Sequence, residues 1–116
     1  MLVSIIIPAF NSTLTISDTL NSILAQSYLN WEALVIDDGS TDDLENFIRR
    51  FTDPRIKYFY KVNGGVASAR NFGIKNAGGD CIAFLDSDDA WKKNKLQNQM
   101  EVFSKNENIE NLNEQS

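Results

Sequence analysis

Short apolar runs alternate with helical patterns along this chain, and this alternation constrains the fold more than any other feature. The apolar runs fall at residues 3–7, 31–36, 56–62 and 81–85, and apolar residues recur at helical spacing between them. Strands that are separated by helices pair in parallel, because a parallel pair needs a crossover connection. The sequence therefore predicts an α/β fold with a mostly parallel sheet.

Signals for the ends of helices lie between these runs. Thr15 and Asp18 have the spacing of a capping box at the start of the first predicted helix. Ser40 or Thr41 is the predicted N-cap of the second helix. A last amphipathic helix is predicted to carry three apolar residues on one face: Leu96, Met100 and Phe103.

The length of 116 residues favours one domain. We assign residues 1–104 to an α/β domain, because no Pro/Gly/Ser-rich linker divides them, and residues 105–116 to a polar tail or connector. Cys81 lies in an apolar run, which favours a buried thiol in a reducing compartment. With no apolar run long enough to cross a bilayer and no signal-peptide pattern, we expect a cytoplasmic protein.

The chain contains no histidine, and this excludes several kinds of site. Ser-His-Asp and Cys-His catalysis are excluded, as are imidazole metal sites. Any metal must be held by oxygen ligands, which favours Mg²⁺ or Mn²⁺. The net charge of −5, without a basic stripe, argues against a nucleic-acid partner.

Three of the predicted strands end in polar clusters. The first cluster begins at Pro8, which ends the first strand, and includes Phe10. The second cluster, residues 37–40, follows the second strand, and the third cluster, residues 86–89, follows the fourth strand. In open α/β sheets, ligands bind at the carboxyl ends of parallel strands. We therefore expect these clusters to meet at one edge of the sheet and form a ligand site.

The last cluster places three carboxylates, Asp86, Asp88 and Asp89, within four residues. One of them can cap the next helix, but three exceed that need, and like charges this close raise each other's pKa unless a cation neutralises them. For these three aspartates, the sequence favours a solvated helix cap and a metal site equally. An EF-hand does not fit, because Trp91 stands where its loop needs glycine and Gln97 where it needs glutamate.

Three further candidates each have a structural and a functional interpretation. Asp38 can accept a hydrogen bond from a uracil N–H or a ribose hydroxyl. Phe10 can stack on a base, although a core position is slightly favoured. Arg70 can add positive charge near phosphates or form a surface ion pair. The glycine pairs at 64–65 and 78–79 match no phosphate-binding fingerprint, so a pyrophosphate near the aspartates needs a bridging divalent cation.

The chain resembles the family-2 glycosyltransferases, which have a GT-A fold, in five segments that occur in the family's order: residues 3–11, 22–28, 31–42, 63–73 and 79–91. Together they cover roughly residues 2 to 103. The resemblance implies a Rossmann-like three-layer α/β/α sandwich. It also implies that the chain is the nucleotide-sugar-binding portion of such an enzyme, truncated before the acceptor half.

The resemblance further implies roles for individual residues. Pro8 and Phe10 would line the nucleobase pocket, and Asp38 would contact the base. Arg70 and Asn71 would lie in the segment that approaches the sugar donor.

By the same resemblance, Asp86 and Asp88 would form the family's D-x-D motif. Asp88, with Asp89, would lie beside the ribose and a diphosphate-bound Mg²⁺ or Mn²⁺ that acts as a Lewis acid. The family inverts the anomeric centre, and a carboxylate deprotonates the acceptor hydroxyl. In the family that base comes from sequence beyond the D-x-D motif, and no carboxylate after Asp89 lies in a recognisable motif here.

The implied activity is transfer of a sugar from a nucleoside-diphosphate sugar, with UDP favoured, to a saccharide or lipid-linked glycan. The acceptor pathway implies peripheral contact with the inner face of the membrane, and an incomplete sheet edge favours a homo-oligomer. The alternative is a non-catalytic nucleotide-sugar-binding module that needs a partner or the missing half. A response-regulator phosphoacceptor domain shares the βα alternation and the pair Asp37-Asp38, but leaves the cluster at 86–89 without a role.

Overall fold

Parallel strands form the sheet at the centre of the structure, a computed structural model that describes residues 1–105. The sheet has four strands in the order β3-β2-β1-β4: β1 (Val3–Ala9), β2 (Trp31–Asp38), β3 (Ile56–Lys61) and β4 (Cys81–Phe84). All three strand pairings are parallel, which confirms the predicted α/β sheet.

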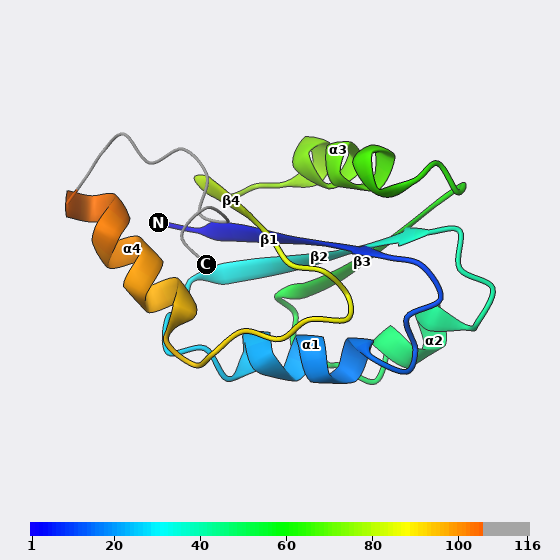
Figure 1. The fold of residues 1–116 in the computed structure, drawn as a ribbon, viewed down its shortest axis with the longest axis horizontal. Coiled ribbons are helices and arrows are strands. Elements are labelled where there is room, and N and C mark those ends of the chain that lie inside the picture. The colour runs from blue at the N-terminus through cyan, green and yellow to red at the C-terminus, as the bar shows by residue number, and fades with distance from the viewer. Residues whose placement is uncertain (106–116) are drawn as a thin grey trace.

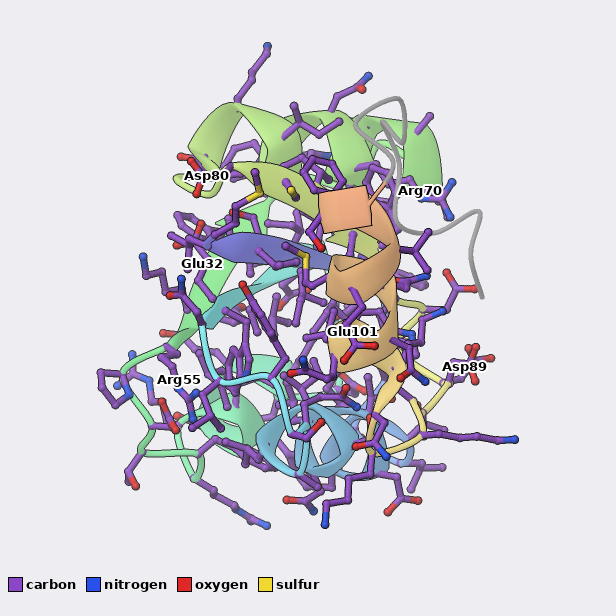
Figure 2. The ribbon with its side chains drawn as sticks, turned by 90° about the vertical axis from the view of Figure 1, so that its left-hand side faces the viewer. Glu32, Arg55, Arg70, Asp80, Asp89 and Glu101 are labelled. Atoms are coloured by element: carbon purple, nitrogen blue, oxygen red, sulfur yellow. The ribbon has the colours of Figure 1, made fainter. Side chains whose placement is uncertain are left out.

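Helices cover both faces of the sheet: α1 (Ile16–Leu24), α2 (Leu44–Ile48), α3 (Val66–Asn76) and α4 (Lys95–Lys105). α1 and α2 lie on one face and α3 on the other (Figure 1), and a view turned by 90° shows the same three layers (Figure 2). The chain passes through α3 from β3 to β4, at the opposite edge, so the strand order reverses between β1 and β4. Such a switch point is where open α/β sheets bind ligands.

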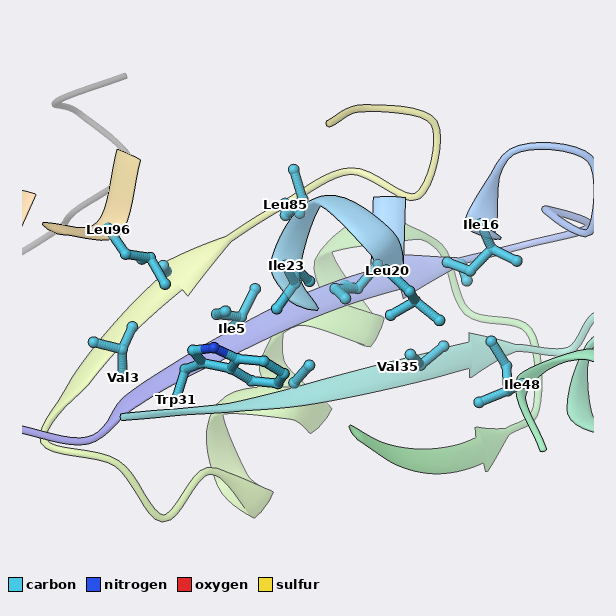
Figure 3. Close-up of a cluster of buried hydrophobic side chains, with 14 of the residues drawn as sticks. Val3, Ile5, Ile16, Leu20, Ile23, Trp31, Val35, Ile48, Leu85 and Leu96 are labelled. Carbon is cyan, nitrogen blue, oxygen red and sulfur yellow. The ribbon is translucent and has the colours of Figure 1, made fainter. Parts of the chain in front are cut away.

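Each strand serves two cores, because successive side chains point to opposite faces of a sheet. Ile6 and Ile36 pack toward α3, whereas the neighbouring odd-numbered residues of both strands pack toward α1 and α2. Figure 3 shows the larger of these cores, in which the labelled side chains are fully or almost fully buried: Val3, Ile5, Ile16, Leu20, Ile23, Trp31, Val35, Ile48, Leu85 and Leu96.

The last helix packs against this larger core as predicted. Leu96 is fully buried in it, and Met100 and Phe103 pack against it from the same helix. Cys81 is buried, also as predicted, and burial raises the pKa of its thiol. Within residues 1–105, no helix has the length and apolar character needed to cross a membrane. The predicted tail or connector lies, from residue 106 on, outside the described residues.

α3 approaches the sheet closely at Gly73. A Cβ atom at this position would lie 2.5 Å from Cγ2 of Ile6, a separation that real Cβ atoms essentially never show. The glycine therefore allows the helix backbone to lie directly against β1.

The predicted cap of the first helix is confirmed in position only, and that of the second helix is wrong. Thr15 is the N-cap of α1, but its side chain makes no capping hydrogen bond, and its hydroxyl instead donates to the backbone carbonyl of Ser87 at 2.9 Å. Asp43, rather than Ser40 or Thr41, is the N-cap of α2, with a φ of 63° that aspartate tolerates. In both places a long-range contact has taken the side chain that the local pattern assigned to capping.

Pro8 lies within β1 instead of ending it. The carbonyl of Ile6 accepts from the amide of Leu85, so the backbone of Ile6, and of Pro8 two residues later, faces β4. The pairing of β1 with β4 stops at Ile6 and Phe84. The missing N–H of Pro8 therefore removes no hydrogen bond from the sheet.

Candidate functional site

A cavity of about 580 Å³ lies at the carboxyl ends of β1, β2 and β4 and beside the start of α3. Its volume is in the range of small-molecule sites. The expectation that three polar clusters meet at one edge is confirmed, because its wall includes a residue from each. Five residues singled out in the sequence line this cavity: Pro8, Phe10, Asp38, Asp86 and Asp88.

Asp38 ends β2 and is only 5% exposed. Nζ of Lys61 and the amide of Gly64 donate to its Oδ1 at 2.8 and 2.9 Å. The amide of Gly65 donates to its Oδ2 at 2.9 Å. Burial alone would raise the pKa of this carboxyl, but the three hydrogen bonds together outweigh burial and lower it. Asp38 is thus an ionised acceptor that also fixes the loop before α3.

Phe10 is 52% exposed, so its slightly favoured assignment to the core is wrong. β1 has ended at Ala9, and Asn11 turns the chain with a φ of 51°. The Asn11 amide donates to Oγ of Ser40 at 2.9 Å, and its Oδ1 accepts from the amide of Thr41 at 2.8 Å. The turns after β1 and β2 are therefore hydrogen-bonded to each other, and the Phe10 ring lies at the cavity.

The acidic loop, residues 86–91, is held by its backbone against α1. The hydroxyl of Thr19 lies 3.0 Å from the carbonyl oxygen of Ser87 and 2.5 Å from that of Asp89. Thr15 donates to the same Ser87 carbonyl. The side chain of Ser87 meets the hydroxyl of Ser12 at 2.7 Å.

Two further side chains extend this contact past the end of α1. The amide of Trp91 donates to Oγ of Ser22 at 3.1 Å. Gln26 donates to the carbonyl of Lys92 at 2.7 Å and accepts from the amide of Leu96 at 3.1 Å. We call the four holding side chains the polar stripe: Thr15, Thr19, Ser22 and Gln26. Their spacing is that of one helix face, a signal in the sequence that could have identified them.

Arg70 approaches the acidic loop from α3 and lines a second cavity, of about 830 Å³, beside β4 and α4. Its guanidinium lies 3.7 Å from Oδ1 of Asp86 and 5.2 Å from the centre of the Phe84 ring. The predicted surface ion pair is therefore present. Figure 2 shows Arg70 and Asp89 on the same side of the molecule. Asn71 is exposed on α3 and, among the described residues, lines neither of these two cavities.

The carboxylates of Asp86 and Asp88 offer the oxygen donors that Mg²⁺ and Mn²⁺ prefer. Within residues 1–105, however, no three His, Cys, Asp or Glu side chains converge to hold a metal. Mg²⁺ is usually bound by one or two carboxylates together with substrate phosphates. This donor set therefore fits a metal shared with a diphosphate and does not fit a closed protein cage. Asp89 lines the larger cavity, and its Oδ1 accepts from the amide of Ala90 at 2.8 Å.

Comparison with known proteins identifies the family of this chain. Residues 4–110 match the sequence profile of glycosyl transferase family 2. The chain is 48% identical over 106 residues to the Escherichia coli UDP-Glc:alpha-D-GlcNAc-diphosphoundecaprenol beta-1,3-glucosyltransferase WfgD, covering 90% of this chain and 42% of that protein.

Two solved structures are similar in fold. TarS of S. aureus in complex with UDP-GlcNAc has a TM-score of 0.87 at 30% identity, covering 92% of this chain and 32% of that chain. The mannosyltransferase PcManGT of Pyrobaculum calidifontis, in complex with GDP-Man and Mn²⁺, has a TM-score of 0.82 at 27% identity, covering 88% and 32%. The chain thus spans less than half the length of each of these three proteins. It belongs to glycosyl transferase family 2 and has the α/β architecture of the GT-A fold.

Proposed function

We propose that this chain binds a nucleoside-diphosphate sugar, with UDP as the favoured nucleotide, and is the donor-binding part of an inverting glycosyltransferase. The observation that carries the proposal is that Asp38, Phe10 and the pair Asp86 and Asp88 line one cavity. The relative WfgD is named for a UDP-Glc donor, and TarS was solved with UDP-GlcNAc, which supports the choice of nucleotide.

The nucleobase would lie between Pro8, Phe10 and Asp38. The half-exposed ring of Phe10 offers a surface for stacking, and Asp38 offers an ionised oxygen to a ring N–H or a ribose hydroxyl. Arg70, beside the acidic loop, and Asn71 would belong to the segment of α3 that approaches the sugar donor.

The diphosphate would lie next to the acidic loop. The resemblance implies Asp88 and Asp89 as the residues at the metal, but Asp89 lines the other cavity. Asp88, beside Asp86, would therefore hold Mg²⁺ or Mn²⁺ together with the phosphate oxygens, and Asp89 would add negative charge nearby. When bound, the metal supplies a Lewis acid that stabilises negative charge on the departing diphosphate. The structure of PcManGT with GDP-Man and Mn²⁺ supports this assignment.

The proposed reaction displaces the diphosphate by an acceptor hydroxyl, with inversion at the anomeric carbon. A saccharide or lipid-linked glycan is the proposed acceptor. WfgD is named for a diphosphoundecaprenol-linked acceptor, which supports the lipid-linked glycan. The reaction needs a general base for the hydroxyl proton. We assign no residue of this chain to that role.

Calorimetric titration of UDP into the chain tests the proposal, first with Mn²⁺ and then with EDTA. We expect metal-dependent binding that weakens by about tenfold or more in Asp88→Asn, because a charge-assisted contact is lost. Asp18→Asn, an exposed carboxylate on α1, is the matched control and should bind as the unmodified chain does. Equal binding by the Asp88 variant would contradict the assignment of the metal.

Donor hydrolysis and sugar transfer, measured on the same preparation, separate the two candidate functions. Turnover supports a catalytic unit. Tight, metal-dependent binding without hydrolysis or transfer assigns the chain as a nucleotide-sugar-binding module.

A further inference from the structure

We infer that Lys61 is a positioning residue that makes Asp38 an acceptor-only carboxylate, so that the cavity selects nucleobases that carry a ring N–H donor. The inference rests on the proposed function, because it assumes that the base meets Asp38. Lys61 lies at the end of β3 and is not itself in the wall of the cavity, so it would act through Asp38.

The hydrogen bonds of Asp38 leave one acceptor position open. An ionised carboxylate offers about four such positions, two on each oxygen. Both positions on Oδ1 are occupied, by Nζ of Lys61 at 2.8 Å and the amide of Gly64 at 2.9 Å. One position on Oδ2 is occupied by the amide of Gly65 at 2.9 Å. Asp38 can therefore accept one further hydrogen bond, on Oδ2, and can donate none.

Lys61 is placed unusually for a lysine, because its side chain is only 14% exposed. Its ammonium contacts Oδ1 of Asp38 at 2.8 Å and the carbonyl of Val62 at 2.6 Å. A buried ammonium is costly unless it is paired, and the same holds for the buried carboxylate that it contacts. The pair therefore keeps both groups charged and fixes which oxygen of Asp38 remains available.

The other lysine of β3, Lys57, pairs with Glu32 and not with Asp38. Asp37, the neighbour in β2, points to the opposite face of the sheet, where the hydroxyl of Tyr58 donates to it. Its charge thus belongs to a separate hydrogen-bonded pair.

Across the cavity, Asp86 and Asp88 are acidic and would disfavour the ionised form of Asp38. Arg70, on α3, lies 3.7 Å from Asp86 and is directed to the acidic loop. Lys61 is therefore the cation in direct contact with Asp38, and its removal should allow Asp38 to take up a proton at higher pH.

This arrangement would discriminate between bases by the ring atom that faces Oδ2 of Asp38. Uracil and guanine present an N–H there, whereas cytosine presents a bare nitrogen, which is itself an acceptor. The bare nitrogen of cytosine and Oδ2 of Asp38 are both acceptors, so cytosine would leave the buried carboxylate without a donor. The cost of such an unpaired buried group makes a site reject the wrong base. A protonated Asp38 would instead donate to cytosine. Loss of the charge on Asp38 should therefore also abolish the discrimination between bases.

The test measures the affinities of UDP and CDP, with Mg²⁺, at pH 7.5 and pH 5.5. We expect the unmodified chain to prefer UDP at both pH values. In Lys61→Met we expect the preference to fall by about tenfold, and to fall further at pH 5.5 as Asp38 takes up a proton. Lys61→Arg should restore the preference and its flat pH profile, because it restores the charge and the donor.

Lys57→Met is the matched control. Lys57 lies at the other end of β3 and pairs with the buried Glu32 at 2.8 Å, so this variant loses an equivalent ion pair away from the cavity. We expect it to be less stable to heat and to keep the unmodified preference for UDP. If Lys61→Met does not fold, Lys61→Gln takes its place, since it keeps a donor and removes the charge.

The outcomes separate the two proposals. A folded, unmodified chain that binds neither nucleotide overturns the proposed function and this inference with it. UDP binding with the same UDP/CDP ratio and pH profile in the Lys61 variants overturns the inference alone. An equal loss of preference in Lys57→Met would assign the effect to stability and would also overturn it.

Discussion

The side-chain hydroxyl of Thr19, in the middle of α1, lies 2.5 Å from the backbone carbonyl oxygen of Asp89, at the end of the acidic cluster. Thr19 is fully buried, and the same hydroxyl is 3.0 Å from the carbonyl oxygen of Ser87. One buried hydroxyl on α1 therefore contacts two backbone carbonyls of the loop that carries the carboxylates. This relationship leads to a direct test of how the site is built.

We predict that Thr19→Val destabilises the chain by about 1–2 kcal/mol, because the loop carbonyls lose a buried donor while the side-chain volume is kept. The affinity for UDP with Mn²⁺ should fall by about fivefold, since one of the contacts that fix the loop is lost. Urea unfolding and calorimetry measure the two effects. Thr52→Val, at an exposed position in the loop before β3, is the control. Unchanged stability of the Thr19 variant would contradict the role of its hydroxyl.

Phe10 provides a test that separates binding from folding. Because its ring is half exposed, Phe10→Ala should change the free energy of unfolding by less than about 0.5 kcal/mol. It should weaken UDP binding by about tenfold, since stacking of a base on an aromatic ring contributes about 1–3 kcal/mol. Leu14→Ala removes a side chain that is 96% exposed in the same connection between β1 and α1, and it should leave UDP binding unchanged. Equal effects of the two variants would exclude stacking on Phe10.

Gly73→Ala sets helix propensity against packing. In an exposed helix this change would stabilise by about 1 kcal/mol. Here the added Cβ would lie 2.5 Å from Cγ2 of the buried Ile6, and overpacking of this kind costs about 1–3 kcal/mol. We predict a net loss of stability in chemical denaturation. Gly78→Ala is the control, because a Cβ there would meet Glu32 at an ordinary 3.7 Å. Stabilisation by Gly73→Ala would show that α3 can move away from the sheet.

The pair Asp53 and Arg55 predicts part of the acid sensitivity of the fold. Hydrogen bonds from the Arg55 side chain, and then from its amide, lower the pKa of Asp53 to about 2. The unfolded value is about 3.9, so the ionised form contributes stability above about pH 4, and this contribution is lost as the pH falls toward 2. The stability difference between the unmodified chain and Asp53→Asn should therefore be constant near neutral pH and disappear over that window. A stability difference between the two chains that persists unchanged at pH 2 would contradict the assignment of this acid sensitivity to Asp53.

The strands could be predicted because burial on both faces leaves nearly continuous apolar runs, as in residues 3–7 and 31–36, which are interrupted only at Ser4 and Glu32. The hydrogen bonds of the capping residues could not be predicted. Thr15 is the N-cap of α1, as its local pattern indicates, but its hydroxyl bonds to Ser87, 72 residues away. Nothing in a local window reports a partner at that distance. Pro8 was misjudged for a similar reason, since its place in β1 depends on where β4 ends.

The meeting of the polar clusters could also be predicted, because parallel order alone brings the ends of β1, β2 and β4 to one edge. Lys61 could not be found in this way. A lysine at the end of a strand normally indicates a solvated position, and its partner Asp38 lies 23 residues earlier in the chain. The exposure of Phe10 depended on the turn that Asn11 makes, which the sequence pattern did not specify.

The polar stripe of α1 contacts the acidic loop through carbonyl and amide groups, which every residue type except proline carries alike. These contacts with α1 use no side chain at positions 86, 88 and 89. An exchange of those side chains would alter charge or metal preference without removing any of these contacts. The residues of the polar stripe hold the acidic loop in place, and the aspartates after β4 supply its charge. These two roles lie in separate stretches of the chain.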